Sequence, residues 1–145
     1  MRCYYLFKIN NNFSRLYSNK IYYLYKTLED ISKSNKNDFI VSYKLYSQIV
    51  GAYNKTEINS IIYRLFCFDK NYNKSLNKHT YNDGIEKTKL TVYNSYIKIK
   101  SNKNITKFFK PLRKEESILV CDFENKDYFW LNDSFLKTLA QSNYF

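Results

Sequence analysis

The sequence predicts an α+β fold, an open sandwich in which strands and helices follow the order β-α-β, a long insertion, then β-β-α. Two observations support this prediction. Short aromatic or β-branched segments alternate with segments of helical periodicity. In addition, 44% of the 145 residues are hydrophobic and 19% are aromatic, which suffices for a buried core. We therefore expect a single domain, 1–145.

The first third of the chain supplies the β-α-β unit. Residues 3–9 form an aromatic strand, and the three asparagines that follow form a turn and a helix cap. From Phe13 to Ile31, apolar residues recur at spacings of three and four, which predicts one amphipathic helix. Residues 33–38 form a polar loop, and 38–46 a second strand.

The middle segment, 48–88, is predicted to be an insertion that forms an extended loop. Asn54 and Glu57 have the spacing of a capping box, so we expect a short helix at about 55–67. Residues 69–89 are polar, rich in asparagine and without periodicity, which indicates a loop or the tip of a long hairpin.

Strand content returns at 89–99 and again at 117–124. A short last helix is expected at 133–139, and 143–145 would add a final edge strand. Three apolar residues share one face of the strand at 117–124: Leu119, Cys121 and Phe123.

The composition reflects the gene as much as the protein. Lys, Asn, Tyr, Phe and Ile, whose codons are rich in A and T, make up more than half of the chain. Ala, Gly, Pro and Arg, with codons rich in G and C, are scarce. This bias points to an organelle, a parasite or a large virus. The abundance of Lys and Asn alone therefore says nothing about function.

The composition also argues against most enzyme classes. The cysteines Cys3, Cys67 and Cys121 are too far apart for a zinc knuckle, and their odd number suggests a reducing compartment. One histidine, His79, and two glycines argue against histidine-based metal sites, catalytic triads and phosphate loops. No run of eighteen apolar residues occurs, so no membrane span is expected. We predict a protein without catalytic residues, metal or cofactor.

The remaining candidate groups have simpler interpretations. Asp122, Glu124 and Asp127 have the ligand type for a divalent cation, but Asp122 and Glu124 also fit the wet face of a strand. His79 is interpreted as loop polarity, and Trp130 as a core or interface anchor.

The basic charge is concentrated in segment 87–114, which carries nine of the 24 basic residues and no acidic residue. Such a block repels itself unless a polyanion neutralises it, and rings among cations are typical of RNA surfaces. We expect a basic arm that becomes ordered when it docks; the alternative is a solvated lysine-rich face that reflects the codon bias. The predicted RNA-binding residues are Lys87, Lys89, Tyr96, Lys98, Lys100, Lys103, Lys107, Lys110, Arg113 and Lys114.

Several short stretches resemble the small-subunit ribosomal protein S-ten family. Leu6–Phe13 followed by Asn19–Lys26 is similar to that family's opening strand and helix. Thr91–Ser95 and Lys98–Ser101 resemble its Thr-Val-Leu-Arg-Ser-Pro-His stretch and the Lys-Lys-Ser that follows. A weaker resemblance, in 58–65 and 97–105, is to the RNA-binding module of the S-four family.

The S-ten resemblance implies a ferredoxin-like sandwich with an extended basic loop. It further implies a structural constituent of an organellar small ribosomal subunit, bound to ribosomal RNA and to other ribosomal proteins and not forming a free homo-oligomer. Together with the codon bias, it predicts a mitochondrial matrix protein that is organelle-encoded rather than imported. The alternatives are a matrix-side accessory structural subunit of a respiratory-chain complex, and a viral or plasmid nucleic-acid enzyme.

Overall fold

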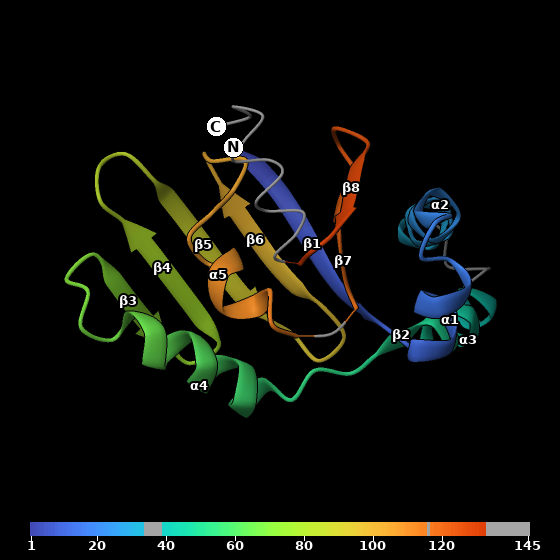
Figure 1. Cartoon of the computed structure of the whole chain (residues 1–145), viewed down its shortest axis with the longest axis horizontal. Coiled ribbons are helices and arrows are strands. Elements are labelled where there is room, and N and C mark those ends of the chain that lie inside the picture. The colour runs from blue at the N-terminus through green and yellow to red at the C-terminus, as the bar shows by residue number, and fades with distance from the viewer. Residues whose placement is uncertain (34–38, 116, 133–145) are drawn as a thin grey trace.

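The computed structural model describes residues 1–33, 39–115 and 117–132 (Figure 1). Its centre is an eight-stranded antiparallel sheet in the order β3-β4-β5-β6-β1-β7-β8, with β2 paired to the end of β1. The strands are β1 (Arg2–Ile9), β2 (Val50–Gly51), β3 (Tyr72–Ser75), β4 (Lys78–Asn82), β5 (Lys87–Val92), β6 (Ile97–Ser101), β7 (Ile118–Asp122) and β8 (Asp127–Trp130). The helices are α1 (Asn11–Leu16), α2 (Ile21–Ser32), α3 (Phe39–Ile49), α4 (Lys55–Phe66) and α5 (Phe109–Leu112). The mixed α and β composition is confirmed, but the ferredoxin-like order is not.

The strand β1 lies in the middle of the sheet and is covered on both faces. It pairs antiparallel with β6 on one side and with β7 on the other. Tyr4 and Leu6 belong to one apolar cluster, whereas Phe7 and Ile9 belong to a second. Because successive side chains of a strand point to opposite faces, the sheet has a hydrophobic core on each side.

The first core lies between the sheet and the helices α4 and α5, which cross in front of the sheet in Figure 1. Ile58, Ile62 and Phe66 recur at helical spacing along α4 and are buried. The helix begins after Asn54, whose side chain accepts a hydrogen bond from the backbone N–H of Glu57 at 3.1 Å. The helix predicted at 55–67 is thus confirmed, together with its cap.

The second core lies on the opposite face, under α2 and α3. Its buried members from the helices and from the sheet are Phe7, Ile9, Leu24, Tyr25, Leu28, Ile49, Val50, Leu119 and Cys121. Its buried strand residues come from β1, β2 and β7, and Tyr128 and Trp130 of β8 pack against it. Among the described residues, the same face of β3, β4 and β5 carries no helix and stays open to solvent.

The amphipathic helix predicted from Phe13 to Ile31 is two helices, α1 and α2, with a turn between Tyr17 and Lys20. The Ser18 hydroxyl donates to the carbonyl of Arg15 at 3.4 Å. Serine and asparagine offer the backbone local hydrogen bonds that compete with the helix, which explains a break at Ser18-Asn19. The apolar period continued across the break, so it did not reveal the turn.

The strand predicted at 38–46 is wrong, because this segment forms the helix α3. Ile40 and Val41 are β-branched and favoured a strand. However, Tyr46 and Ile49 stand three residues apart and pack together against the second core, which requires the helical period. Tertiary packing overrides the local propensity here.

The loop predicted at 69–89 is also wrong, because it contains the hairpin β3–β4 and the start of β5. Tyr81 and His79 are buried on β4, and Gly84 occupies the following turn with a φ of 88°. The strand predicted at 89–99 is two strands, β5 and β6, joined by a turn at 93–96. Segment 48–88 therefore contributes strands to the sheet.

The strand predicted at 117–124 is confirmed as β7, and it continues through a hairpin into β8. Leu119 and Cys121 lie in the second core with Phe123 packed against it, as the alternation predicted. Trp130 and its two preceding aromatic neighbours belong to β8, and Trp130 packs against the second core. The helix predicted at 133–139 and the edge strand at 143–145 lie outside the described residues.

Candidate functional site

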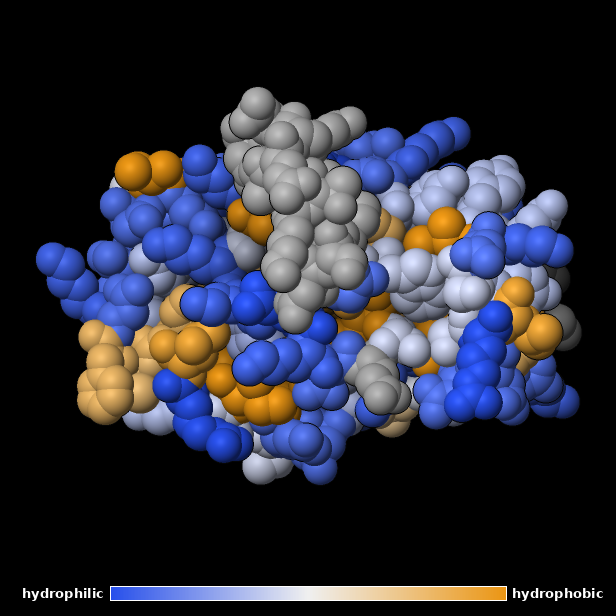
Figure 2. All heavy atoms as spheres, in the orientation of Figure 1, coloured by the Kyte–Doolittle hydropathy of each residue, from blue (hydrophilic) through white to orange (hydrophobic). Residues whose placement is uncertain are grey.

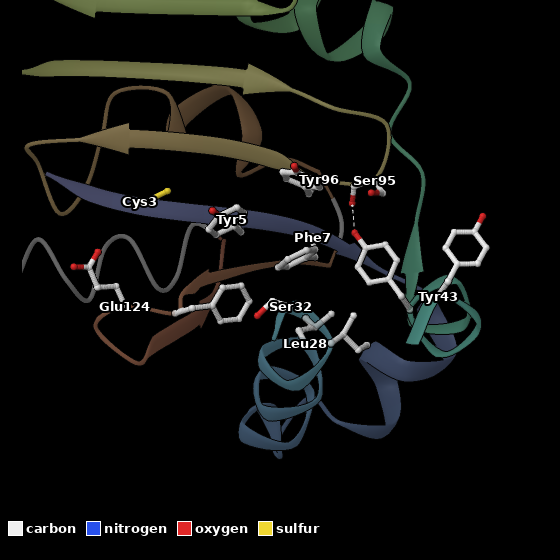
Figure 3. A pocket seen from close by; sticks show the side chains of 12 residues that line it. Cys3, Tyr5, Phe7, Leu28, Ser32, Tyr43, Ser95, Tyr96 and Glu124 are labelled. Carbon is white, nitrogen blue, oxygen red and sulfur yellow. Dashed lines mark hydrogen bonds between the residues drawn. The ribbon is translucent and has the colours of Figure 1, made fainter. Parts of the chain in front are cut away.

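An apolar groove of about 650 Å³ opens between the sheet and the helices α2 and α3 (Figure 3). Its floor is formed by Tyr5 and Phe7 of β1 and by Tyr96 from the turn before β6. Leu28 of α2 forms one wall, and Tyr43 of α3 stands at the far end. The remaining lining residues are Cys3, Ile31, Ser32, Tyr46, Ser95, Phe123 and Glu124.

Aromatic contacts hold the floor of the groove in place. The ring centroids of Tyr5 and Tyr96 lie 5.8 Å apart, and those of Tyr5 and Phe123 lie 5.6 Å apart. Tyr96 also stacks on Tyr93 at 4.7 Å. The Tyr46 hydroxyl donates to the carbonyl of Ser95 at 3.1 Å and so fixes α3 to the β5–β6 turn. Ring pairs at these separations stabilise a defined shape beyond the area that they bury.

The groove combines apolar walls with a few neutral hydroxyl groups. Burial raises the pKa of Tyr5 to about 12 and also raises the pKa values of Tyr46 and Tyr96. These phenols are therefore uncharged at neutral pH and serve as hydrogen-bond donors. Tyr43 is 61% exposed at the mouth of the groove. This arrangement suits binding of an apolar side chain.

A second apolar surface lies on the other side of the molecule, near α4. Figure 2 shows hydrophobic side chains at the surface in this region, and the exposed ones include Tyr63, Leu65 and Phe68. The groove between the sheet and α2–α3 is distinguished by its concave shape and by ring contacts that preform it.

The ten predicted RNA-binding residues divide between the two sides of the sheet. Lys87, Lys89, Lys98 and Lys100 project from β5 and β6 on the open face, away from the first core. Tyr96 lies in the floor of the groove. Lys103 follows β6 and is exposed. The other four, Lys107, Lys110, Arg113 and Lys114, lie in or near α5, on the side of the first core.

The open face also carries a lysine that the sequence did not identify. Lys78 of β4 stands opposite Thr91, which in turn stands opposite Lys98. We call Lys78, Lys87, Lys89, Lys98 and Lys100 the lysine face. Lys78 lies on β4, in the segment predicted to be a loop, so its place on a sheet face could not be predicted.

The basic segment is not an arm that awaits docking. Leu90 on β5 and Ile97 and Ile99 on β6 are fully buried in the first core. The buried hydroxyls of Thr88 and Ser101 form a hydrogen bond with each other at 2.7 Å. The buried polar groups at the end of β6 therefore have hydrogen-bond partners as well. Only the lysine side of these strands faces solvent.

The acidic residues near β7 form an ion-pair cluster with an arginine. Asp122 is 1% exposed and accepts from Arg2 Nε at 2.9 Å, while Asp127 accepts from Arg2 Nη2 at 2.8 Å. The interpretation of Asp122 as part of a wet face was therefore wrong. In the described residues, no three His, Cys, Asp or Glu side chains are arranged to hold a metal ion.

His79 is a buried residue rather than part of a polar loop. Its Nδ1 lies 2.6 Å from the Tyr72 hydroxyl, and its Nε2 lies 2.8 Å from Asn59 Oδ1. Burial, aided by Lys74, lowers its pKa to about 4. A neutral imidazole with both nitrogens bonded links α4 to the β3–β4 hairpin and has a structural role.

None of the helices in the described part of the chain has both the length and the hydrophobicity that crossing a bilayer requires. Residues 2–134 match a family model described as "SirA: Sporulation inhibitor of replication protein SirA". No individually curated protein matches this chain.

The family match corrects the functional predictions drawn from the sequence. SirA is a bacterial family, so the S-ten and S-four resemblances were wrong. The ribosomal role, ribosomal RNA and ribosomal proteins as partners, and the mitochondrial location are wrong with them. A respiratory-chain subunit is unsupported too. The AT-rich composition belongs to a bacterial gene, and short matches in a Lys-, Asn- and Ile-rich sequence carry little information.

The extent of the match decides the assignment. It runs from the first residue of β1 to beyond the last residue of β8, and so includes both cores, the groove and the lysine face. The chain belongs to the SirA family of sporulation inhibitors of replication.

Proposed function

We propose that this protein inhibits DNA replication by binding a protein of the replication machinery in the groove between the sheet and α2–α3, without catalysing a reaction. The family description supports the process, and the preformed aromatic groove supports the mode of action. The replication initiator is the first candidate partner. Binding it blocks replication at a step that uses few target molecules, which suits a stoichiometric inhibitor.

The single observation that carries the docking mode is the composition of the groove. Its floor and mouth are built from Tyr5, Phe7, Tyr43 and Tyr96, and aromatic residues of this kind dominate the binding energy of protein interfaces. Lys98 and Lys100 stand beside Tyr5 and Cys3 at one edge of the groove. The groove therefore favours an apolar segment that has acidic residues on one flank.

The test is replication initiation in a purified bacterial system, with increasing amounts of this protein added. A non-catalytic inhibitor gives a half-maximal concentration that rises in proportion to the initiator concentration. Inhibition that progresses with time at substoichiometric amounts would indicate an enzyme instead.

The site is tested by a pair of matched variants. Tyr43→Asp places a charge at the mouth of the groove and should weaken inhibition at least tenfold. Tyr63→Asp is the control, because Tyr63 is an exposed helical tyrosine as well, but on α4 across the sheet. Equal loss in both variants, with both still folded, would remove the groove from the mechanism. Full-length protein that never inhibits would overturn the proposed function itself.

A further inference from the structure

We propose that the lysine face is a binding site for the phosphate backbone of duplex DNA. The face lies on β4, β5 and β6, opposite the core that holds α4 and α5. Two of its residues, Lys98 and Lys100, pair with Tyr5 and Cys3 of β1, which line the groove. The lysine face thus adjoins the groove along this edge, and its DNA binding goes beyond the proposed protein contact.

The face has an unusual charge pattern for a folded sheet. The strand residues of β3 to β6 that point to this side are Asn73, Ser75, Lys78, Thr80, Asn82, Lys87, Lys89, Thr91, Lys98 and Lys100. Five of them are lysines and none is acidic. Among the described residues, none of the five lysines forms an ion pair.

The nearest acidic residues in sequence are already occupied. Asp83 accepts from Lys107 Nζ at 3.5 Å, on the other side of the sheet. Glu86 is buried and accepts from the hydroxyl of Thr88 at 2.7 Å. Glu124 lines the adjoining groove but forms no ion pair with these lysines. The positive charge of the lysine face is therefore unpaired among the described residues, and like charges on paired strands oppose folding. An external anion removes this repulsion.

The residues between the lysines indicate which anion binds. The other five positions are Asn, Ser and Thr, whose side chains donate hydrogen bonds to phosphate oxygens. None of the ten is apolar or aromatic. A protein partner would need apolar anchors, and interface cores are depleted in lysine. Single-stranded nucleic acid would need rings on which the bases stack.

The spacing of the lysines and the family's link to replication both favour duplex DNA as the ligand. Neighbouring strands lie about 4.8 Å apart, and alternate residues along a strand lie about 6.7 Å apart. The lysines thus form a flat grid on the scale of the phosphate spacing of a DNA backbone. The family description links the protein to replication, for which duplex DNA is the template. Because the contacts are to phosphates alone, we expect binding that is independent of sequence.

The test is titration of a fluorescent 20-base-pair duplex with the full chain, followed by anisotropy at 50 to 200 mM salt. Five phosphate contacts predict that affinity falls about 500-fold over this range. The variant K87Q/K89Q/K100Q should bind more weakly at 50 mM, and its affinity should fall only about 12-fold.

The matched control is K74Q/K110Q/K114Q, which loses the same charge. These exposed lysines lie on β3 and around α5, on the other side of the sheet. The control should keep the wild-type salt dependence, and urea unfolding confirms that both triple variants are folded. An equal effect of the two triple variants would show a response to net charge alone and overturn the proposal.

Further probes separate the competing anions. Tighter binding of a single-stranded 20-mer, of polyglutamate or of vesicles containing phosphatidylglycerol, with the same dependence on Lys87, Lys89 and Lys100, would overturn the assignment to duplex DNA. Tyr43→Asp, in the groove, should bind the duplex as the wild type does. This variant separates a failure of the DNA site from a failure of the proposed protein contact.

Discussion

Lys89 on β5 and Lys100 on β6 stand directly opposite each other, on the same open face of the sheet. Like charges in such a cross-strand pair destabilise the folded state. We therefore expect K100E to increase the free energy of unfolding by about 0.2–1 kcal/mol. Urea unfolding at 20 mM and at 500 mM salt tests this, because the gain should shrink as salt screens the charges. The exposed Lys44 of α3 provides a control, and an equal gain from K44E would contradict the pairing.

Stability should fall in mild acid because of His79. Its pKa is about 4 in the folded protein, whereas a histidine in the unfolded chain has a pKa of about 6.5. Between these values the unfolded state binds more protons, so the free energy of unfolding decreases as the pH falls from 6.5 to 4. The slope contributed by this group is at most about 1.4 kcal/mol per pH unit.

Comparison with H79Q isolates this effect, since the glutamine amide can still bond to Tyr72 and Asn59 but does not titrate. Urea unfolding at pH 7, 6 and 5 should show a difference between the two proteins that changes with pH. A constant difference would mean that His79 does not titrate in this window.

Removal of Arg2 should lower the free energy of unfolding, because Asp122 is buried beside it. Burial alone would raise the pKa of Asp122, but hydrogen bonds from Asn125 and Arg2 outweigh it and keep the pKa low. R2A leaves a buried carboxylate without its cation and should destabilise the fold by about 1–3 kcal/mol. Thermal unfolding measures the loss. D127A is the comparison, because Asp127 is 48% exposed and its pairing with Arg2 should matter less. A larger loss of stability in D127A than in R2A would contradict this prediction.

Amide hydrogen exchange should show strong protection in β5 and β6 of the free protein. Both strands have hydrogen-bonded neighbours on each side, and their alternate residues are buried. This expectation reverses the one drawn from the sequence, which predicted a loop or hairpin tip at 69–89 and, in 87–114, a basic arm that becomes ordered only when it docks. If 88–92 and 97–101 exchanged at the rate of an unfolded chain while β1 stayed protected, this segment would be disordered in the free protein and the prediction would be wrong.

The sequence predicted elements where one local pattern dominated. The alternation of Leu119 and Cys121 predicted β7, and the Asn54–Glu57 pair predicted the start of α4. The hairpin β3–β4 was missed because its buried positions include His79, a polar residue that alternation of hydropathy does not mark. It is buried because Asn59 and Tyr72 bond to both of its ring nitrogens, and this complementarity exists only in the folded protein.

The surfaces could be predicted only in part for a related reason. Lys87, Lys89, Lys98 and Lys100 were identified together because they lie close in sequence. Lys107 and the later cations of the segment were included for the same reason, although the chain crosses to the other side of the sheet before α5. The groove brings together five distant parts of the chain, one of which, α3, was predicted as a strand.

The central position of β1 sets the order in which the molecule can assemble. Both of its long-range partners, β6 and β7, are synthesised about 90 to 120 residues later. At 5–20 residues per second, the strand waits roughly 5–20 s on the ribosome with its aromatic side chains uncovered and its edges unpaired. Pairing then closes the longest loops of the chain, which makes folding slow for a domain of this size. A nascent chain that stops before β7 leaves a hydrophobic strand edge open, and such edges recruit other chains or chaperones.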